Sequence, residues 1–398
     1  MGLQEDIKLD AGLSFAESTQ EAAGKEAVFV TGGAGFVGSH IVYQLLATTS
    51  MPVFCIARSQ NATSARDRVV ERVSQYGEVP QRYLDSLVVF EGDFTAARLA
   101  LKGPEYDRVL RDVGTIIHCG AQINLLYPYS ALRKANVEGT RELLRLASDS
   151  HVAAFHQVSS MAVYGDRGSH KAEGSGENQV PTRDCASGYA QSKWASEQLV
   201  LEARARGLNS YIHRPNAITG HSISGVCNEL DVLSLMLAAC MVLRMAPAMM
   251  ETVTLTPVDD VVHAILVRYR ASERRGGEQD ITGYRTCSWE TIRTILTEEA
   301  LIDQICEHDK WQVAVSRWAL QNPESRISPL AWFLRPANPQ QQSAEGDLDS
   351  AQVAPEATRS MNGLNDDGAE LMRQQIRWLA GRLGRITNGP RERGLVLR

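Results

Sequence analysis

Apolar and polar residues follow two different rhythms along the first half of the chain. Short runs rich in Val, Ile and Phe predict strands at 27–31, 52–57, 87–93, 115–121, 153–160 and 210–215. Longer amphipathic stretches predict helices at 36–47, 136–148 and 187–200. Short β-branched runs separated by helices are typical of crossover connections between parallel strands. The pattern therefore predicts an α/β fold with a Rossmann-type doubly wound parallel sheet over residues 26–215.

The alternation fades after about residue 215. Helical patterns then dominate, at 230–243, 259–271, 289–302 and 369–383, with one strand-like run at 252–258. We expect residues 216–398 to form a smaller, mainly helical substrate lobe, with some return of the chain to the sheet. Residues 1–25 are polar and weakly patterned, which predicts a leader or linker. Residues 336–358 are rich in Pro, Gln, Ser and Ala, which predicts an exposed, mobile loop.

Composition narrows the class of protein. With 398 residues, 43% of them hydrophobic, the chain is long enough to bury at least one large core. Its formal net charge of −6 provides no basic field, so nucleic acid is not an expected partner. The most apolar segment, 232–250, is interrupted by Arg244 and Pro247. Its uninterrupted part is shorter than the roughly 20 residues of a spanning helix, so no membrane contact is expected.

The seven cysteines occur singly, without a CxxC pair. Such spacing is typical of reduced thiols and predicts no metal site. The N-terminus has no basic segment followed by an apolar run, so we expect a cytoplasmic protein. As an excised domain, the chain is expected to be monomeric.

Three glycines with GxxGxxG spacing directly follow the first predicted strand, in the segment VFVTGGAGFVGSH. One glycine allows a tight turn, one lets backbone amides approach a pyrophosphate, and one allows close contact between helix and strand. The free amides of the helix that follows can then bind the anion. The predicted dinucleotide site contains Thr31, Gly32, Gly35, Phe36, Val37 and Gly38.

The second predicted strand ends at Arg58, where an NAD-binding chain usually has an acidic residue for the ribose hydroxyls. A cation at this position favours a 2′-phosphate, so NADPH is the predicted cofactor. Arg68 is a second candidate for the phosphate, with an ordinary surface arginine as the alternative. Asp93 ends the third strand, where the adenine would lie, and is otherwise a simple turn residue.

The segment SGYAQSKWASEQLV places Tyr189 four residues before Lys193, on one face of a predicted helix. The unperturbed pKa of tyrosine is about 10, and an adjacent ammonium lowers it towards the range useful for proton transfer. This spacing also occurs by chance on ordinary solvated helices. Here, however, Ser159 and Ser160 end an upstream strand at the same predicted edge of the sheet. A serine there can donate a hydrogen bond to a carbonyl oxygen as charge develops on it.

The glycine turn, serine, tyrosine and lysine, in this order, resemble the extended short-chain dehydrogenase/reductase superfamily. The catalytic hydroxyl of that superfamily lies four residues before the tyrosine of its VYG motif, which corresponds to Ser160 here. The resemblance implies that Tyr189 is the proton donor and that Lys193 binds the nicotinamide ribose and tunes the tyrosine. It also implies that HCGA, with Gly120 and Ala121, lies beside the cofactor. NVEGT begins with Asn136, which is otherwise a buried packing amide.

A more specific resemblance covers about residues 26–335. The segments HCGAQINLLYPYSALRKANVEGTRELLRLA, GYAQSKWASEQLV, RPNAITGHSISG and LTPVDDVVHAI resemble the terminal thioester reductase domains of nonribosomal peptide and polyketide synthetases, and their relatives in carboxylic acid reductases. The resemblance implies NADPH-dependent release of an acyl or peptidyl thioester from the phosphopantetheine arm of a carrier protein, as an aldehyde or further as an alcohol. Two departures are Ser160 for the usual threonine and Asn216 for a common glycine.

Two other functions remain open at this point. A nucleotide-sugar epimerase or dehydratase of the same superfamily would normally hold NAD, and Arg58 argues against it. A non-catalytic NADPH-binding scaffold would leave Tyr189 and Lys193 idle. The methionine-rich helix at 232–250 either shapes an entry channel for the arm or is plain hydrophobic core.

Overall fold

The computed structural model describes residues 3–15, 24–165, 187–271, 276–334 and 368–388. The chain divides into two compact units. The first contains residues 1–216 and 259–282, and the second contains residues 217–258 and 283–398. The chain first crosses from one unit to the other after residue 216, next to the boundary expected near residue 215. It then returns to the first unit over residues 259–282. The loop predicted at 336–358 lies outside the described residues.

A seven-stranded sheet forms the centre of the first unit, in the order β10-β6-β5-β4-β1-β2-β3. All neighbouring strands in it are parallel. The strands are β1 (Ala27–Thr31), β2 (Val53–Ala57), β3 (Leu87–Glu91), β4 (Val113–His118), β5 (Ala154–Val158), β6 (Ser210–Pro215) and β10 (Gly277–Ile281). The strand order changes direction between β1 and β4, and sheets of this type bind ligands outside the carboxyl ends of the strands at such a point.

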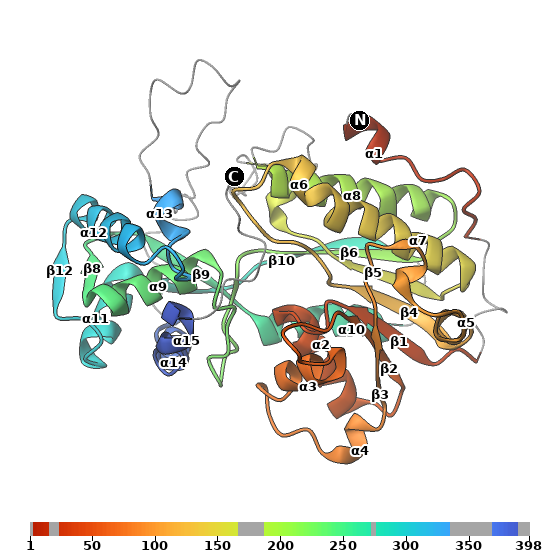
Figure 1. Ribbon diagram of the computed structural model, residues 1–398, viewed down its shortest axis with the longest axis horizontal. Coiled ribbons are helices and arrows are strands. Elements are labelled where there is room, and N and C mark those ends of the chain that lie inside the picture. Colours follow the sequence, from red (N-terminus) through yellow and green to blue (C-terminus); the bar gives the residue numbers. More distant parts are fainter. Residues whose placement is uncertain (1–2, 16–23, 166–186, 272–275, 335–367, 389–398) are drawn as a thin grey trace. The chain divides into compact units, whose positions relative to one another are not determined.

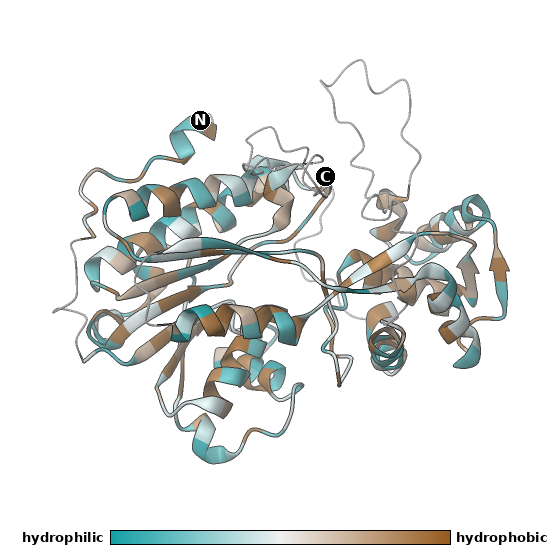
Figure 2. Cartoon of the chain, turned by 180° about the vertical axis from the view of Figure 1, so that it is seen from behind, coloured by the Kyte–Doolittle hydropathy of each residue, from teal (hydrophilic) through white to brown (hydrophobic). Residues whose placement is uncertain are grey.

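Helices cover both faces of this sheet (Figure 1). One face carries α6 (Tyr129–Arg133), α7 (Gly139–Asp149) and α8 (Gly188–Ala205), and the other carries α2 (Phe36–Thr48), α3 (Ala65–Val73) and α10 (Val258–Arg270). Two further helices, α4 (Gln81–Leu84) and α5 (Gly103–Asp112), precede β3 and β4. Every residue of β1 and β2 is buried, which explains their unbroken apolar runs. Figure 2 shows hydrophobic residues along the strands and both hydrophobic and hydrophilic residues on the covering helices.

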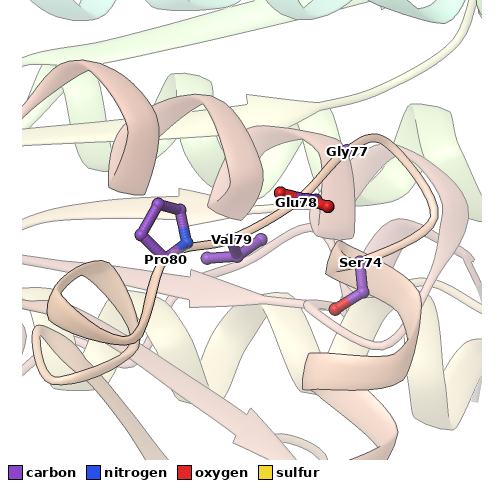
Figure 3. Close-up of a pocket in the computed structure, with 5 residues that line it drawn as sticks. All are labelled: Ser74, Gly77, Glu78, Val79 and Pro80. Carbon is purple, nitrogen blue, oxygen red and sulfur yellow. The ribbon is translucent and has the colours of Figure 1, made fainter.

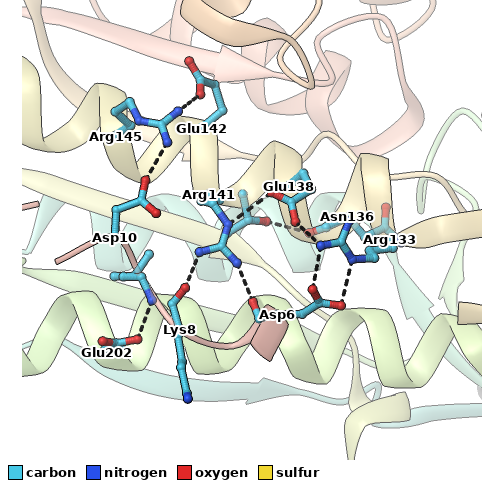
Figure 4. Close-up of polar contacts among 12 residues, drawn as sticks. Asp6, Lys8, Asp10, Arg133, Asn136, Glu138, Arg141, Glu142, Arg145 and Glu202 are labelled. Atoms are coloured by element: carbon cyan, nitrogen blue, oxygen red, sulfur yellow. Dashed lines mark hydrogen bonds and ion pairs between the residues drawn. The ribbon is translucent and has the colours of Figure 1, made fainter. Parts of the chain in front are cut away.

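The described part of the predicted leader, which begins with α1 (Leu3–Asp6), packs against α6, α7 and α8 (Figure 4). The Asp6 carboxylate is buried and accepts hydrogen bonds from Arg133 at 2.6 and 2.8 Å and from the Tyr129 hydroxyl at 2.7 Å. Leu9 and Phe15 are buried in the apolar core of the first unit. This packing differs from a free leader. The sequence shows no periodicity there because separate polar contacts and single apolar side chains, rather than a regular apolar face, attach the segment.

The second unit combines helices with short strands. Its helices are α9 (Val232–Leu243), α11 (Trp289–Glu298), α12 (His308–Gln321), α13 (Leu330–Phe333), α14 (Ala369–Ala380) and α15 (Leu383–Asn388). Its strands are β7 (Ile218–Thr219), β8 (Met245–Pro247), β9 (Thr252–Pro257), β11 (Arg285–Ser288) and β12 (Gln304–Cys306). β9 lies at the single strand predicted for this region. The largest side chains of its core are Trp289 and Trp311, and Met241 of α9 is buried among them.

The apolar helix α9 has 12 residues. In the parts of the chain that the structure describes, no helix is both long and apolar enough to cross a membrane.

Candidate active site

The glycine turn after β1 has the close backbone contacts that its sequence predicts. Gly32 has a φ of +72°, a region that favours glycine, and its carbonyl oxygen accepts a 2.8 Å hydrogen bond from the amide of Gly35. A Cβ atom on Gly38 would lie 2.2 Å from the Gly32 carbonyl oxygen. Only glycine at position 38 therefore lets the start of α2 lie this close to the turn. Within the described residues, no side chain caps α2 at Gly35. The backbone amides of Phe36 and Val37, at the N-terminus of α2, can therefore donate hydrogen bonds to a pyrophosphate.

The structure brings together the three residues predicted to bind the adenosine end of a cofactor. The Arg68 guanidinium donates a hydrogen bond to the carbonyl oxygen of Arg58. The Arg58 guanidinium lies 3.8 Å from the Asp93 carboxylate, and 76% of the Arg58 side chain is exposed. An ion pair that is this exposed is weak, so Arg58 remains available to a phosphate. Asp93 also caps its own turn by accepting a 2.9 Å hydrogen bond from the amide of Thr95.

Thr31 links the glycine turn to the end of β4. Its hydroxyl accepts a 3.0 Å hydrogen bond from the amide of Gly120 and lies 2.7 Å from Nδ1 of His118. Burial, together with the charge of Lys193, lowers the pKa of His118 to about 3, so this imidazole is neutral. Gly120 and the half-buried Ala121 therefore lie where the carboxyl ends of β1 and β4 meet.

The two serines that follow β5 have different partners. Ser159 is buried, and its hydroxyl donates a hydrogen bond to the Glu197 carboxylate. Ser160 is half-buried; its hydroxyl accepts from the amide of Ala162 at 3.2 Å, and its side chain acts to lower the pKa of Tyr189. Of the two serines, Ser160 is the one that the VYG spacing indicates.

Tyr189 and Lys193 are both buried on α8. Burial shifts the pKa values of their functional groups in opposite directions. Burial raises the pKa of Tyr189 to about 12, and the hydrogen bond with Ser160 opposes this rise. Burial lowers the pKa of Lys193 to about 8, and its ammonium donates a 2.9 Å hydrogen bond to the Val158 carbonyl oxygen. The expectation that the ammonium leaves Tyr189 with a lowered pKa is wrong for this structure, because desolvation of the phenolate dominates.

Three consecutive residues at the end of β5 are each hydrogen-bonded to α8. The bonded pairs are Gln157 with Ser196, Val158 with Lys193, and Ser159 with Glu197. These bonds hold the chain that leads into Ser160 against the helix that carries Tyr189 and Lys193. The arrangement can donate hydrogen bonds and a proton to an oxygen atom at the carboxyl edge of the sheet.

Sequence reasoning did not identify Glu197 and Arg214, and it left Asn136 between two interpretations. Asn136 is buried, and its amide nitrogen donates to the Ser192 hydroxyl at 2.9 Å and to the Gln122 carbonyl oxygen at 3.0 Å. It therefore attaches the chain after β4 to α8. A charged residue inside a strand-like run, as in SYIHRP, is the signal that points to Arg214, since buried arginines are paired.

A separate pocket of about 500 Å³ lies on the loop after α3 (Figure 3). Its lining residues are Ser74, Gly77, Glu78, Val79 and Pro80. They include none of the residues predicted for the site. This pocket is therefore distinct from the candidate site at the carboxyl edge of the sheet.

Comparison with known proteins gives consistent matches. The sequence model of an NAD-binding family described as male sterility protein matches residues 30–265, more than half of the chain. A linear gramicidin synthase polypeptide from Brevibacillus parabrevis is 32% identical over 65% of this chain and 5% of its own length. The large subunit of L-2-aminoadipate reductase from Candida glabrata is 34% identical over 63% of this chain and 19% of its own length. The chain thus spans less than a fifth of the length of these two relatives.

A solved structure extends the likeness to nearly the whole chain. The terminal R domain from the myxalamid PKS-NRPS biosynthetic pathway has a TM-score of 0.75 and is 25% identical, with 96% of this chain and 97% of that chain covered. The structural similarity therefore extends beyond residues 30–265, the part that the family's sequence model matches.

Proposed function

Because the chain belongs to the NAD-binding family described as male sterility protein, we propose that it is an NADPH-dependent reductase that releases a carrier-bound thioester. The substrate is an acyl or peptidyl chain on the phosphopantetheine arm of a carrier protein, and the product is an aldehyde. The observation that carries the proposal is the buried Lys193 ammonium, which donates a 2.9 Å hydrogen bond to the Val158 carbonyl oxygen at the end of β5, one helical turn from the buried Tyr189 and two residues before Ser160. The synthetase and reductase relatives support the substrate class.

The residues at the carboxyl edge fit a phosphorylated dinucleotide. The uncapped start of α2 offers its amides to the pyrophosphate, and the absence of a Cβ atom at Gly38 lets the helix lie against the glycine turn. Arg58 and Arg68 would hold the 2′-phosphate, and Asp93 would lie at the adenine. Gly120, Ala121 and Lys193 would border the nicotinamide ribose. When bound, NADPH supplies the hydride that reduces the thioester carbon.

The chain's own side chains act on the oxygen of the substrate. Ser160 donates a hydrogen bond to the thioester oxygen as negative charge develops on it. Tyr189, with its pKa raised to about 12, keeps its proton near neutral pH and delivers it to that oxygen. The resulting hemithioacetal loses its carbon–sulfur bond, so that an aldehyde and a free thiol leave. A second round would give the alcohol.

The alternative of a nucleotide-sugar epimerase or dehydratase uses the same Ser–Tyr–Lys set. Such an enzyme recycles tightly held NAD, for which an acidic residue at the end of β2 is typical. Arg58 occupies that place with an exposed guanidinium. A net reduction with NADPH is therefore the function that these residues favour.

The test measures loss of NADPH absorbance with an acyl-phosphopantetheine thioester, and then with a carrier protein loaded with the same acyl group. We expect NADPH to be consumed and the aldehyde or alcohol to be identified by mass spectrometry. The matched oxygen ester, which lacks the thiol leaving group, serves as the control. Turnover of a nucleotide sugar, with no NADPH consumption on any thioester, would reverse the assignment.

A further inference from the structure

A buried ion pair joins α8 to the end of β6. The Arg214 guanidinium donates to the Glu197 carboxylate from Nε at 3.0 and 3.1 Å and from Nη2 at 2.8 Å. The Glu197 side chain is 0% exposed and the Arg214 side chain 6% exposed. Burial alone would lower the pKa of Arg214, but the hydrogen bonds and the charge of Glu197 outweigh it and raise that pKa. Arg214 therefore keeps its positive charge although it is buried.

This ion pair contacts both ends of the turn that contains Ser160. At the start of the turn, Ser159 donates its hydroxyl proton to Glu197. At the end, the Tyr164 hydroxyl accepts a 3.0 Å hydrogen bond from Nη1 of Arg214. The same hydroxyl donates to the Asp280 carboxylate of β10 at 2.7 Å. The short helical turn Met161–Tyr164 is therefore held at both ends by charges that come from other elements.

Stability alone is a weak reason for such a pair. Desolvation of two charges roughly cancels their attraction, and well-packed apolar residues at such sites are often equally stable or more stable. What the pair does provide is direction, because each hydrogen bond specifies the position of one atom. Glu197 lies one helical turn beyond Lys193, and its charge partly offsets the effect of burial on that ammonium. The ion pair thus contacts both ends of the turn that contains Ser160, and the charge of Glu197 also acts on the pKa of Lys193.

We propose that the Glu197–Arg214 pair is a positioning device that sets Ser160 against Tyr189. Neither residue touches the reacting atoms; both act through Ser159 and Tyr164. This inference rests on the proposed function for its effect on catalysis. Its structural part, the restraint on residues 159–165, does not depend on any substrate.

The test compares Glu197→Gln with Glu278→Gln. Glu278 of β10 pairs with Arg204 of α8, so the control variant also removes a carboxylate that pairs with an arginine. This second pair is more exposed, with 25% of the Arg204 side chain and 37% of the Glu278 side chain accessible, and it is not bonded to the turn that contains Ser160. Two quantities are measured on the full chain: amide hydrogen exchange of the peptide covering 159–165 by mass spectrometry, and kcat and KM for NADPH with the acyl-phosphopantetheine thioester. Glu197→Gln should accelerate exchange about tenfold and lower kcat by about 10- to 100-fold, with KM for NADPH changed less than about twofold. Glu278→Gln should change neither.

Two milder variants keep the proposal testable if Glu197→Gln does not fold. Ser159→Ala and Tyr164→Phe each remove one attachment of the turn and keep the ion pair, and each should lower kcat by about 3- to 10-fold with the KM for NADPH retained. Faster exchange without loss of kcat would show a purely structural pair and overturn the proposal. Unchanged exchange in Glu197→Gln would overturn it as well. If the wild-type protein reduces no thioester, the proposed function fails, and the exchange comparison still decides whether the pair restrains the turn.

Discussion

The ammonium of Lys193 lies 2.9 Å from the carbonyl oxygen of Val158, the last residue of β5. A lysine side chain is long enough to span from the helix to the strand, and here its hydrogen bond fixes the ammonium at the carboxyl edge of the sheet. Tyr189 lies one turn earlier on α8, and Ser160, which acts to lower the pKa of Tyr189, lies two residues after Val158. The helix therefore places the phenol and the amine on one face, near the end of β5.

Replacement of Tyr189 by Phe should remove the proton donor. Because general acid catalysis contributes about 10²- to 10⁴-fold, we expect kcat to fall at least about 100-fold, with little change in KM for NADPH. Loss of NADPH absorbance with an acyl-phosphopantetheine thioester measures both constants. Tyr211→Phe, a change of a buried tyrosine on β6, is the matched control for loss of a phenol. A Tyr189→Phe enzyme with wild-type kcat would exclude this residue as the donor.

The pH dependence should follow Lys193 rather than Tyr189. Burial lowers the pKa of the lysine to about 8, so the ammonium is present below that pH and is lost above it. The tyrosine, with a pKa raised to about 12, stays protonated over the same range. We therefore expect kcat/KM to decline as the pH rises through about 8, and Lys193→Met should abolish this limb along with most of the activity. A profile that stays flat from about pH 6 to about pH 10 would contradict the assignment.

Arg58→Ala tests the choice of cofactor. A hydrogen bond to a charged group contributes about 1.5 to 3 kcal/mol, so its loss should raise KM for NADPH about tenfold or more and leave KM for NADH nearly unchanged. Arg82→Ala, which removes an arginine that contacts Tyr83 on α4, is the control. Equal effects of Arg58→Ala on both cofactors would remove the phosphate contact from the proposal.

Asp6→Asn should destabilise the first unit. The Asp6 carboxylate is 2% exposed, and hydrogen bonds from Arg133 lower its pKa against the opposing effect of burial. A lowered pKa means that the stabilisation is present above the unfolded value near 4 and is lost as the pH falls through the folded value. We expect about 1 to 3 kcal/mol less free energy of unfolding at neutral pH.

Urea unfolding at neutral and acidic pH measures this difference, which should shrink in acid. Asp10→Asn is the control, since the Asp10 side chain is 53% exposed and its ion pair with Arg145 should contribute less than about 1 kcal/mol. A loss for Asp6→Asn as small as that of the control would show that the N-terminal segment adds little to the stability of the unit.

Local patterns were sufficient for the parts of the site that lie within one turn of chain. The spacing of Gly32, Gly35 and Gly38 predicts the turn because the contacts between Gly32 and Gly38 are steric and act between near neighbours. Tyr189 and Lys193 are four positions apart, which places both on one face of α8 because an α-helix has about 3.6 residues per turn. Strand ends also follow from local pattern, so Arg58 and Ser160 were found at the carboxyl edge of the sheet.

Contacts between distant segments required the folded chain. Asp6 meets Arg133 across 127 positions of sequence. Glu197 and Arg214 lie 17 positions apart on different elements, and no period connects them. The direction in which the pKa of Tyr189 shifts was likewise settled by burial, a property of the packed unit rather than of neighbouring residues. Repeating apolar spacing and steric turns are encoded locally, whereas desolvation and long-range ion pairs exist only once the sheet and its helices enclose them.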